Sequence, residues 1–213
     1  MVFRTMPFLH RPKTFTAWLG LGLMGAVLML LPGISVQAIQ YGSGTYGACG
    51  FGSCSLTIGS SGTVALNVTP TANGSCTIQK DSVSVFTSNS SGFTLTLADT
   101  STNTALLNGA ASISATTGTQ ASPSALAVNR WGYRVDGVGG FGTGPTSAQS
   151  NVSLGSTTFA GVPASNATAS TLASTSSAAN PAVITSVWYG VCANTSVTSG
   201  TYTSQVTYTA VTN

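Results

Sequence analysis

The chain has 213 residues, of which 4% are charged, whereas about a quarter of the residues in soluble domains are charged. It contains no Glu, and its single histidine is His10. General acid–base catalysis relies mostly on His, Glu and Asp side chains, so this inventory argues against an enzyme. Clustered His and Cys ligands are also missing, so we expect neither a metal nor a cofactor.

The first 38 residues have the pattern of a secretory signal peptide. Three basic residues precede an apolar run at 17–31, and small residues lead up to Ala38. The basic residues are Arg4, Arg11 and Lys13. A membrane anchor is the alternative, but a spanning helix needs about 20 apolar residues, and this run is shorter. We therefore expect cleavage after Ala38, export, and no membrane insertion of the mature chain.

Cleavage would leave a mature chain, 39–213, without net charge. It keeps three basic and three acidic residues: Lys80, Arg130, Arg134, Asp81, Asp99 and Asp136. A protein that binds nucleic acid usually carries a basic surface, so we expect no nucleic-acid partner. A low net charge instead favours self-association.

Four cysteines in an exported chain predict two disulfides. They are Cys49, Cys54, Cys76 and Cys192. Three pairings are possible, and we favour Cys49–Cys54 as a local staple and Cys76–Cys192 as a long link. The long link would restrict the unfolded chain most, which is worth about 2–5 kcal/mol.

Residues 39–52 form a Gly-rich N-terminal arm in which Tyr41, Tyr46 and Phe51 are spaced by five. The arm is either a flexible lead-in that the cysteines pin, or an assembly arm that packs on a neighbouring subunit.

Period-two alternation of apolar and polar residues predicts a single β domain over 53–213. The expected strands lie at 55–58, 64–68, 76–80, 83–85, 93–97, 131–135, 184–191 and 202–211. Short strands rich in Thr and Val, with turns between them, are typical of antiparallel sandwiches. We predict an all-β, antiparallel two-sheet β-sandwich, Ig-like or pilin-like, with about eight or nine short strands and disulfide staples.

Three segments interrupt this rhythm. Residues 109–127 and 160–182 are rich in Ala, Ser and Thr and predict long loops, the second with a short helix near 169–176. Residues 137–145 are Gly-rich, with Phe141 at the expected tip. A phosphate-binding loop would need a following Lys and a helix, so a wide turn is the better interpretation.

Two aromatic motifs are the strongest candidates for a binding site. Trp131, Tyr133 and Arg134 lie in one, and Trp188 and Tyr189 lie in the other. They form either an aromatic platform for sugar rings or part of the core, which is the common place for large aromatics on strands. Arg130, Arg134 and Asp136 are the candidates for a small polar network at a strand end.

Four segments, at 89–97, 131–133, 188–192 and 198–210, together carry a resemblance to known proteins. They resemble the small secreted sandwich proteins of Saccharibacteria-type candidate-phylum bacteria, which implies a surface location and a structural or adhesive use. The closing strand is also similar to that of spore-coat-U and fimbrial subunits, which complete each fold with a strand from a neighbour. The four-cysteine spacing of this chain departs from theirs.

We therefore expect an exported, non-enzymatic structural protein at the cell surface or outside the cell. It would assemble into a homo-oligomer or filament, like a pilus or coat subunit. The alternative is a monomeric adhesin or carbohydrate-binding module that binds a host-surface glycan or protein through exposed aromatic residues.

Overall fold

The computed structural model describes residues 54–153 and 155–213, and all the regular structure in these residues is β. The prediction of an all-β fold is confirmed, because Thr- and Val-rich alternating segments pair into sheets. The predicted signal peptide at 1–38 and the arm at 39–52, including Tyr41, Tyr46 and Phe51, lie outside the described residues.

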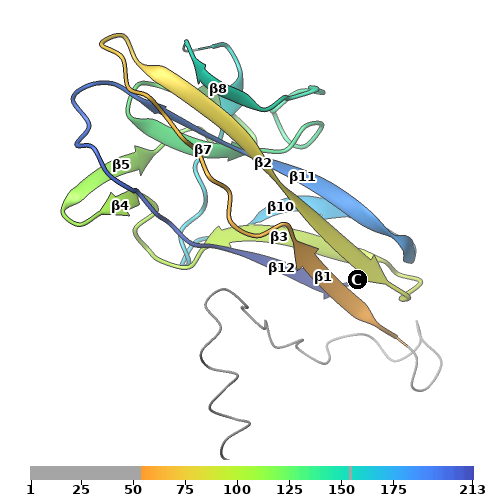
Figure 1. Cartoon of the computed structure of the whole chain (residues 1–213). Coiled ribbons are helices and arrows are strands. Elements are labelled where there is room, and N and C mark those ends of the chain that lie inside the picture. Colours follow the sequence, from red (N-terminus) through yellow and green to blue (C-terminus); the bar gives the residue numbers. More distant parts are fainter. Residues whose placement is uncertain (1–53, 154) are drawn as a thin grey trace, which may run out of the picture. The chain divides into compact units, whose positions relative to one another are not determined.

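The largest sheet has seven strands, in the order β1-β2-β11-β7-β5-β4 with β8 beside β2 (Figure 1). Its strands are β1 (Leu56–Ser60), β2 (Ser75–Thr87), β4 (Leu106–Asn108), β5 (Ala111–Ala115), β7 (Arg130–Arg134), β8 (Gln149–Val152) and β11 (Ala179–Ala193). The long strands β2 and β11 pair antiparallel along most of their length and form the centre of the sheet.

Two smaller sheets complete the fold. One has the order β10 (Ser170–Ser174), β3 (Phe93–Asp99) and β12 (Val206–Thr212), and the other pairs β6 (Ser124–Ala125) with β9 (Thr158–Phe159). In Figure 1 the three-stranded sheet lies against the half of the large sheet that contains β1.

The main core lies between the three-stranded sheet and the large sheet. Residues that alternate along β3 and β2, such as Leu95, Leu97, Val83 and Val85, are fully buried there. Since successive strand residues face opposite ways, the other face of the large sheet needs separate cover. A second, smaller cluster provides it, formed by Cys76, Ile78, Leu126, Phe159, Trp188 and Cys192.

The sheets differ from the plain two-sheet sandwich of the prediction. The large sheet curls and is accompanied by two small sheets. One pairing, between β5 and β7, is parallel, so the prediction of purely antiparallel strands is wrong at this point. The described residues form twelve strands rather than eight or nine, because several are only two or three residues long.

Three of the predicted local structures are also wrong. The short helix expected near 169–176 is strand β10, because Leu172 is buried in the core and the strand pairs with β3. Tertiary pairing overrides the helix propensity of the alanines in this segment. The predicted strand at 64–68 has alternating burial but no ladder. The predicted loop at 109–127 contains β5 and β6.

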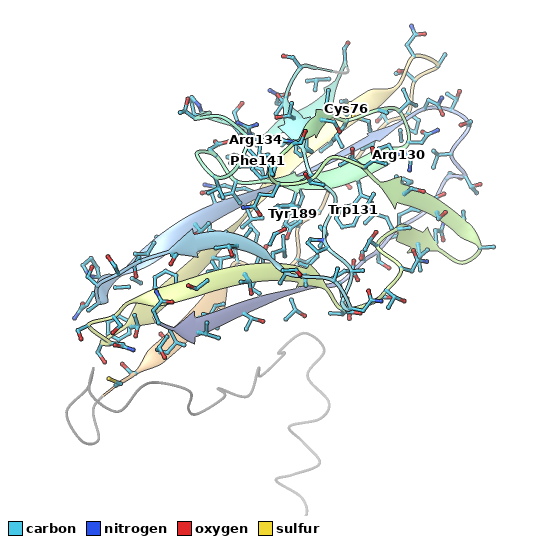
Figure 2. All side chains as sticks on the ribbon, turned by 180° about the vertical axis from the view of Figure 1, so that it is seen from behind. Cys76, Arg130, Trp131, Arg134, Phe141 and Tyr189 are labelled. Atoms are coloured by element: carbon cyan, nitrogen blue, oxygen red, sulfur yellow. A yellow bond between two sulfur atoms is a disulfide. The ribbon has the colours of Figure 1, made fainter. Side chains whose placement is uncertain are left out.

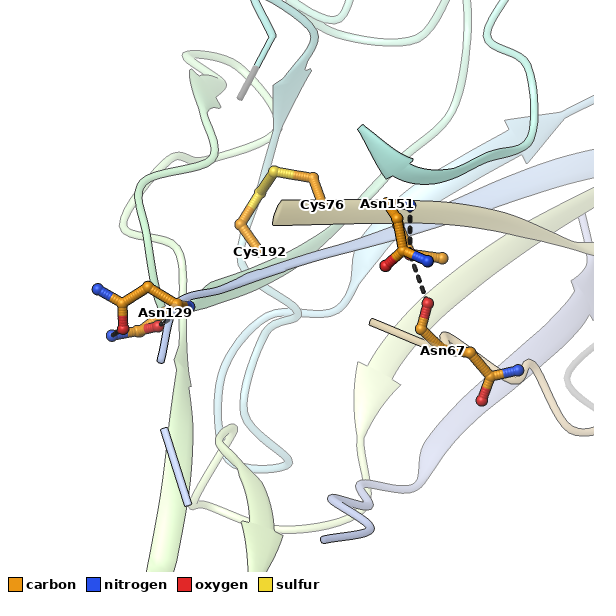
Figure 3. The surroundings of a disulfide bond; sticks show 7 residues. Asn67, Cys76, Asn129, Asn151 and Cys192 are labelled. Atoms are coloured by element: carbon orange, nitrogen blue, oxygen red, sulfur yellow. Dashed lines mark hydrogen bonds between the residues drawn. A yellow bond between two sulfur atoms is a disulfide. The ribbon is translucent and has the colours of Figure 1, made fainter. Parts of the chain in front are cut away.

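The predicted Cys76–Cys192 disulfide is confirmed (Figure 3). The two cysteines are direct partners in the β2–β11 register, with their Cα atoms 4.1 Å apart. Cys54 is also disulfide-bonded, and its predicted partner Cys49 lies outside the described residues. A buried disulfide is typical of proteins that fold in an oxidising, extracellular environment.

Hydrogen bonds close to this disulfide attach neighbouring segments to β2. The backbone N–H of Asn151 donates to the Thr77 hydroxyl at 3.3 Å, and that hydroxyl donates to the carbonyl of Asn67 at 2.7 Å (Figure 3). The segment that precedes β2 and the strand β8 are therefore both held at this end of the sheet.

Candidate functional site

The aromatic residues predicted as a binding platform are buried. Trp131, Tyr133, Trp188 and Tyr189 are 3%, 0%, 8% and 5% exposed. Trp131 and Tyr189 stack inside the main core with ring centroids 6.4 Å apart (Figure 2), whereas Trp188 belongs to the smaller cluster. Because neighbouring strand residues face opposite ways, Trp188 points away from the other three aromatics. All four lie inside the fold, which agrees with the core alternative rather than with an exposed platform.

The polar tips of these aromatics all have partners inside the protein. The Trp131 indole N–H donates to the Thr104 carbonyl at 2.9 Å, and the Tyr133 hydroxyl donates to Gln120 Oε1 at 3.0 Å. Burial raises the pKa of the Tyr133 hydroxyl. The phenol therefore stays neutral and acts as a hydrogen-bonding group within the core.

A pair of tyrosines links the large sheet to β12. The hydroxyls of Tyr189 and Tyr208 lie 2.8 Å apart. Burial, followed by the nearby Tyr189 hydroxyl and the Asp81 carboxylate, raises the pKa of Tyr208 well above its usual range. Burial likewise raises the pKa of Tyr189. Both phenols therefore act as neutral hydrogen-bonding groups within the core.

The predicted polar network at the end of β7 does form. Arg134 Nε lies 2.7 Å from Asp136 Oδ1, and this is the one ion pair in the described part of the chain. Thr146 donates to the same carboxylate through its backbone N–H at 2.7 Å and its hydroxyl at 2.6 Å. Burial alone would raise the pKa of Asp136, but the hydrogen bonds from Thr146 and Arg134 outweigh it and hold that pKa below its usual value. Arg130 takes no part and donates to the carbonyl of Ala115.

The Gly-rich loop after β7 holds this network in place. The backbone of Gly144, which has a φ of 70°, passes so close to the Asp136 carboxylate that a Cβ at this position would clash with it. Phe141 is buried against the Tyr133 ring, with centroids 5.6 Å apart, and lies beneath the Arg134 guanidinium (Figure 2). Phe141 is therefore an anchor for the loop and not its exposed tip.

Beside this network lies a hollow of about 250 Å³. It occurs where β7 ends while β11 continues, so one stretch of β11 borders the hollow and Leu172 of β10 lies at its side. Its polar lining comes from Asp136, Thr185 and Ser186, and Ile184 at its rim is 69% exposed. The other lining residues are Val135, Val138 and Trp188.

The acidic residues of β2 and β3 are removed from the surface. Asp81 and Asp99 are each 2% exposed. Asp81 accepts hydrogen bonds from the Ser60 hydroxyl at 2.7 Å and the Ser61 N–H at 2.9 Å. Asp99 accepts from the backbone N–H of Ser101, two residues later. The Asp-x-Ser spacing is a sequence signal for this turn after β3, whereas the burial of Asp99 depends on tertiary neighbours such as Ser204, whose hydroxyl donates to it.

Lys80 is the one charged residue of the exposed class in the described residues. Its Nζ lies 5.9 Å from the centroid of the Trp188 ring, a cation–π contact on the outer face of the large sheet. Arg130 is half-buried, Arg134 is buried, and Asp136 is paired with Arg134. The described surface is therefore almost uncharged, and the hydroxyl and amide side chains of Ser, Thr, Asn and Gln provide its polarity.

Comparison with family models, curated proteins and solved structures finds no match. Within the described residues, His, Cys, Asp and Glu side chains form no group of three that could hold a metal ion. The same residues contain no helix that is long and apolar enough to cross a membrane.

Proposed function

We propose that this chain is an exported, non-enzymatic structural protein of the cell surface or the extracellular space, and that it self-assembles. The observation that carries the proposal is the almost uncharged surface of the described domain. Like-charged surfaces repel one another and keep proteins apart, and this surface has little such repulsion.

Two further features support the proposal. The Cys76–Cys192 disulfide fits a protein that works in an oxidising compartment. The seven-stranded and three-stranded sheets also end in edge strands that have no further strand partner in the described residues. Such edges are ready templates for pairing with another chain.

The experiment starts from the full chain, including residues 1–38, expressed in a bacterial host that exports proteins. Mass spectrometry of the exported protein should find Ile39 at its N-terminus. Sizing at increasing protein concentration and electron microscopy should then show oligomers or filaments. A protein that remains monomeric at the highest soluble concentration would contradict the proposed assembly.

The hollow beside Asp136 favours a second candidate, a monomeric module that binds a host-surface glycan or protein. It combines a carboxylate, the Ser186 hydroxyl and apolar walls, which is a common composition for small binding sites. A glycan array probed with the monomer tests this candidate. Binding that Ser186→Trp abolishes by filling the hollow would support it, whereas a silent array would remove the glycan version.

A further inference from the structure

The chain contains two Asn-Gly pairs, Asn73-Gly74 and Asn108-Gly109. Asn is a thermolabile residue, and its side-chain amide is most reactive when Gly follows, because Gly has no Cβ to keep its backbone nitrogen away from the amide carbon. The nitrogen can then attack that carbon and expel ammonia. In a folded protein, this attack requires that the Gly N–H can lose its proton to water and that the backbone around it can move.

The Asn108-Gly109 pair lies in an exposed hairpin turn. Asn108 ends β4, and a turn of two residues leads to Ala111 of β5 at the periphery of the fold (Figure 1). Gly109 is exposed with a φ of 58°, and even a Cβ at this position would meet no atom within 4 Å. Because β4 has only three residues, this end of the hairpin can open locally at little cost.

Both reacting groups of this pair are available. In the described part of the chain, the Gly109 N–H and the Asn108 side-chain amide have no hydrogen-bond partner. The Gly109 N–H therefore exchanges its proton with water without first breaking a bond of its own. The amide nitrogen of Asn108 lies over Gly200, where a Cβ would clash with it, so the absence of a side chain at Gly200 leaves the amide its space.

The Asn73-Gly74 pair is held more firmly. The Gly74 N–H donates to the Thr71 carbonyl at 3.1 Å, and Gly74 is buried. Thr71 in turn forms a β-bridge with Asn194, and β2 begins at the next residue, Ser75, which is 3% exposed. Loss of the Gly74 proton therefore requires that a hydrogen bond breaks within a fixed segment, although the Asn73 side chain itself is exposed.

We propose that Asn108 is a site of spontaneous modification, at which the side-chain amide becomes aspartate or isoaspartate. A bond forms between the Gly109 nitrogen and the Asn108 Cγ, the Cγ–Nδ2 bond breaks, and ammonia leaves with the proton of the Gly109 N–H. Water then opens the cyclic succinimide at either of its two carbonyl carbons, which yields the two products. The reaction needs only water, and it is independent of the proposed self-assembly.

The modification changes both the charge and the backbone of the domain. The expected mature chain has no net charge, so each event leaves a copy with a net charge of −1. The new carboxylate lies beside an exposed turn, on a surface where Lys80 is the one exposed charged residue among those described. The isoaspartate product also lengthens the backbone inside the turn that pairs Asn108 with Ala111, which should loosen the β4–β5 hairpin.

Peptide mapping of the exported protein tests the site. The folded protein is incubated at neutral and at mildly alkaline pH, and mass spectrometry follows the exchange of amide for hydroxyl at each Asn. We expect Asn108 to convert about two- to tenfold faster than Asn73, the factor that one additional hydrogen bond on the Gly N–H provides. Conversion should be faster at alkaline pH, because the nitrogen attacks after it loses its proton.

Incubation in urea separates the effect of the fold from that of the dipeptide. Unfolding removes the turn at Gly74, so the two Asn-Gly pairs should then convert at similar rates. If Asn73 converts as fast as Asn108 in the folded protein, or if only the unfolded protein converts at Asn108, the proposal is wrong. Amide hydrogen exchange gives a second measurement, in which the Gly109 N–H should exchange faster than the Gly74 N–H.

A conservative replacement identifies the residue behind the new charge. Asn108→Gln keeps the amide but adds a methylene group, which makes ring closure slow, so the acidic species that ion-exchange chromatography resolves in the aged wild type should nearly disappear. The matched control, Asn73→Gln, should form them at the wild-type rate. An isoaspartyl methyltransferase should label the aged wild type and the control but not Asn108→Gln. Equal acidic species in both variants would overturn the assignment to Asn108.

Discussion

The few charged residues in the described part of this chain lie mostly inside the fold, where each has a hydrogen-bond or ion-pair partner. Asp81 and Asp99 are buried and hydrogen-bonded to serines, and Arg134 is buried beside Asp136. A buried charge is tolerated only when its neighbours satisfy it, and no buried side-chain nitrogen or oxygen lacks a partner in the described residues. The charges therefore fix particular segments in place, and little charge remains for the surface.

Asp136 gives the residue-scale prediction. Asp136→Asn removes the charge that pairs with buried Arg134 and should destabilise the fold by about 1–3 kcal/mol at neutral pH. The folded-state pKa of Asp136 lies below its unfolded value, so its contribution is present above the unfolded pKa and is lost as pH falls through the folded pKa. Thermal unfolding of both proteins between neutral and acid pH should therefore show a difference that shrinks below about pH 4. A difference that stays constant down to acid pH would contradict this role.

At the scale of elements, the two long strands β2 and β11 organise the molecule. Each contributes side chains to the main core from one face and to the smaller cluster from the other. The disulfide joins them at the end where the smaller cluster lies. The central pair is thus held by a ladder, by two apolar clusters and by one covalent link.

The disulfide gives the prediction at this scale. The replacement Cys76→Ala with Cys192→Ala opens a link between residues 116 positions apart and should cost about 2–5 kcal/mol, mainly by freeing the unfolded chain. Urea unfolding of the wild-type and variant proteins measures the loss. Reductant should destabilise the wild type more than the variant, which keeps only the disulfide of Cys54. Equal urea midpoints for the two proteins would show that the link contributes nothing.

For the whole molecule, the decisive property is the scarcity of charge on the described surface. Salt screens interactions between exposed charges, and the described residues contain only one ion pair and one exposed charged residue, Lys80. Stability and assembly should therefore depend on the hydrophobic effect and on hydrogen bonds rather than on long-range electrostatics.

At the scale of the whole molecule, we predict that stability and assembly depend little on salt concentration. Between about 0.02 and about 0.5 M NaCl, where the screening length shortens several-fold, the midpoint of thermal unfolding and the concentration needed for assembly should change little. Sizing and thermal scans across this range provide the measurement. If high salt dissociated the wild-type oligomers into monomers, the contact between copies would be electrostatic instead.

The sequence by itself determined the all-β class and the expectation of disulfides, because alternation with a period of two and an even set of cysteines are local or compositional signals. It left three cysteine pairings possible, and the structure selected the favoured Cys76–Cys192 link by placing the two residues opposite each other on β2 and β11. It also identified Arg134 and Asp136 as a network. Only the tertiary structure decided that Trp131 and Trp188 lie on opposite faces of one sheet, that 170–174 is a strand, and where β7 stops along β11. Those outcomes depend on which strands become neighbours, and pairing between distant segments leaves no periodic trace in either segment alone.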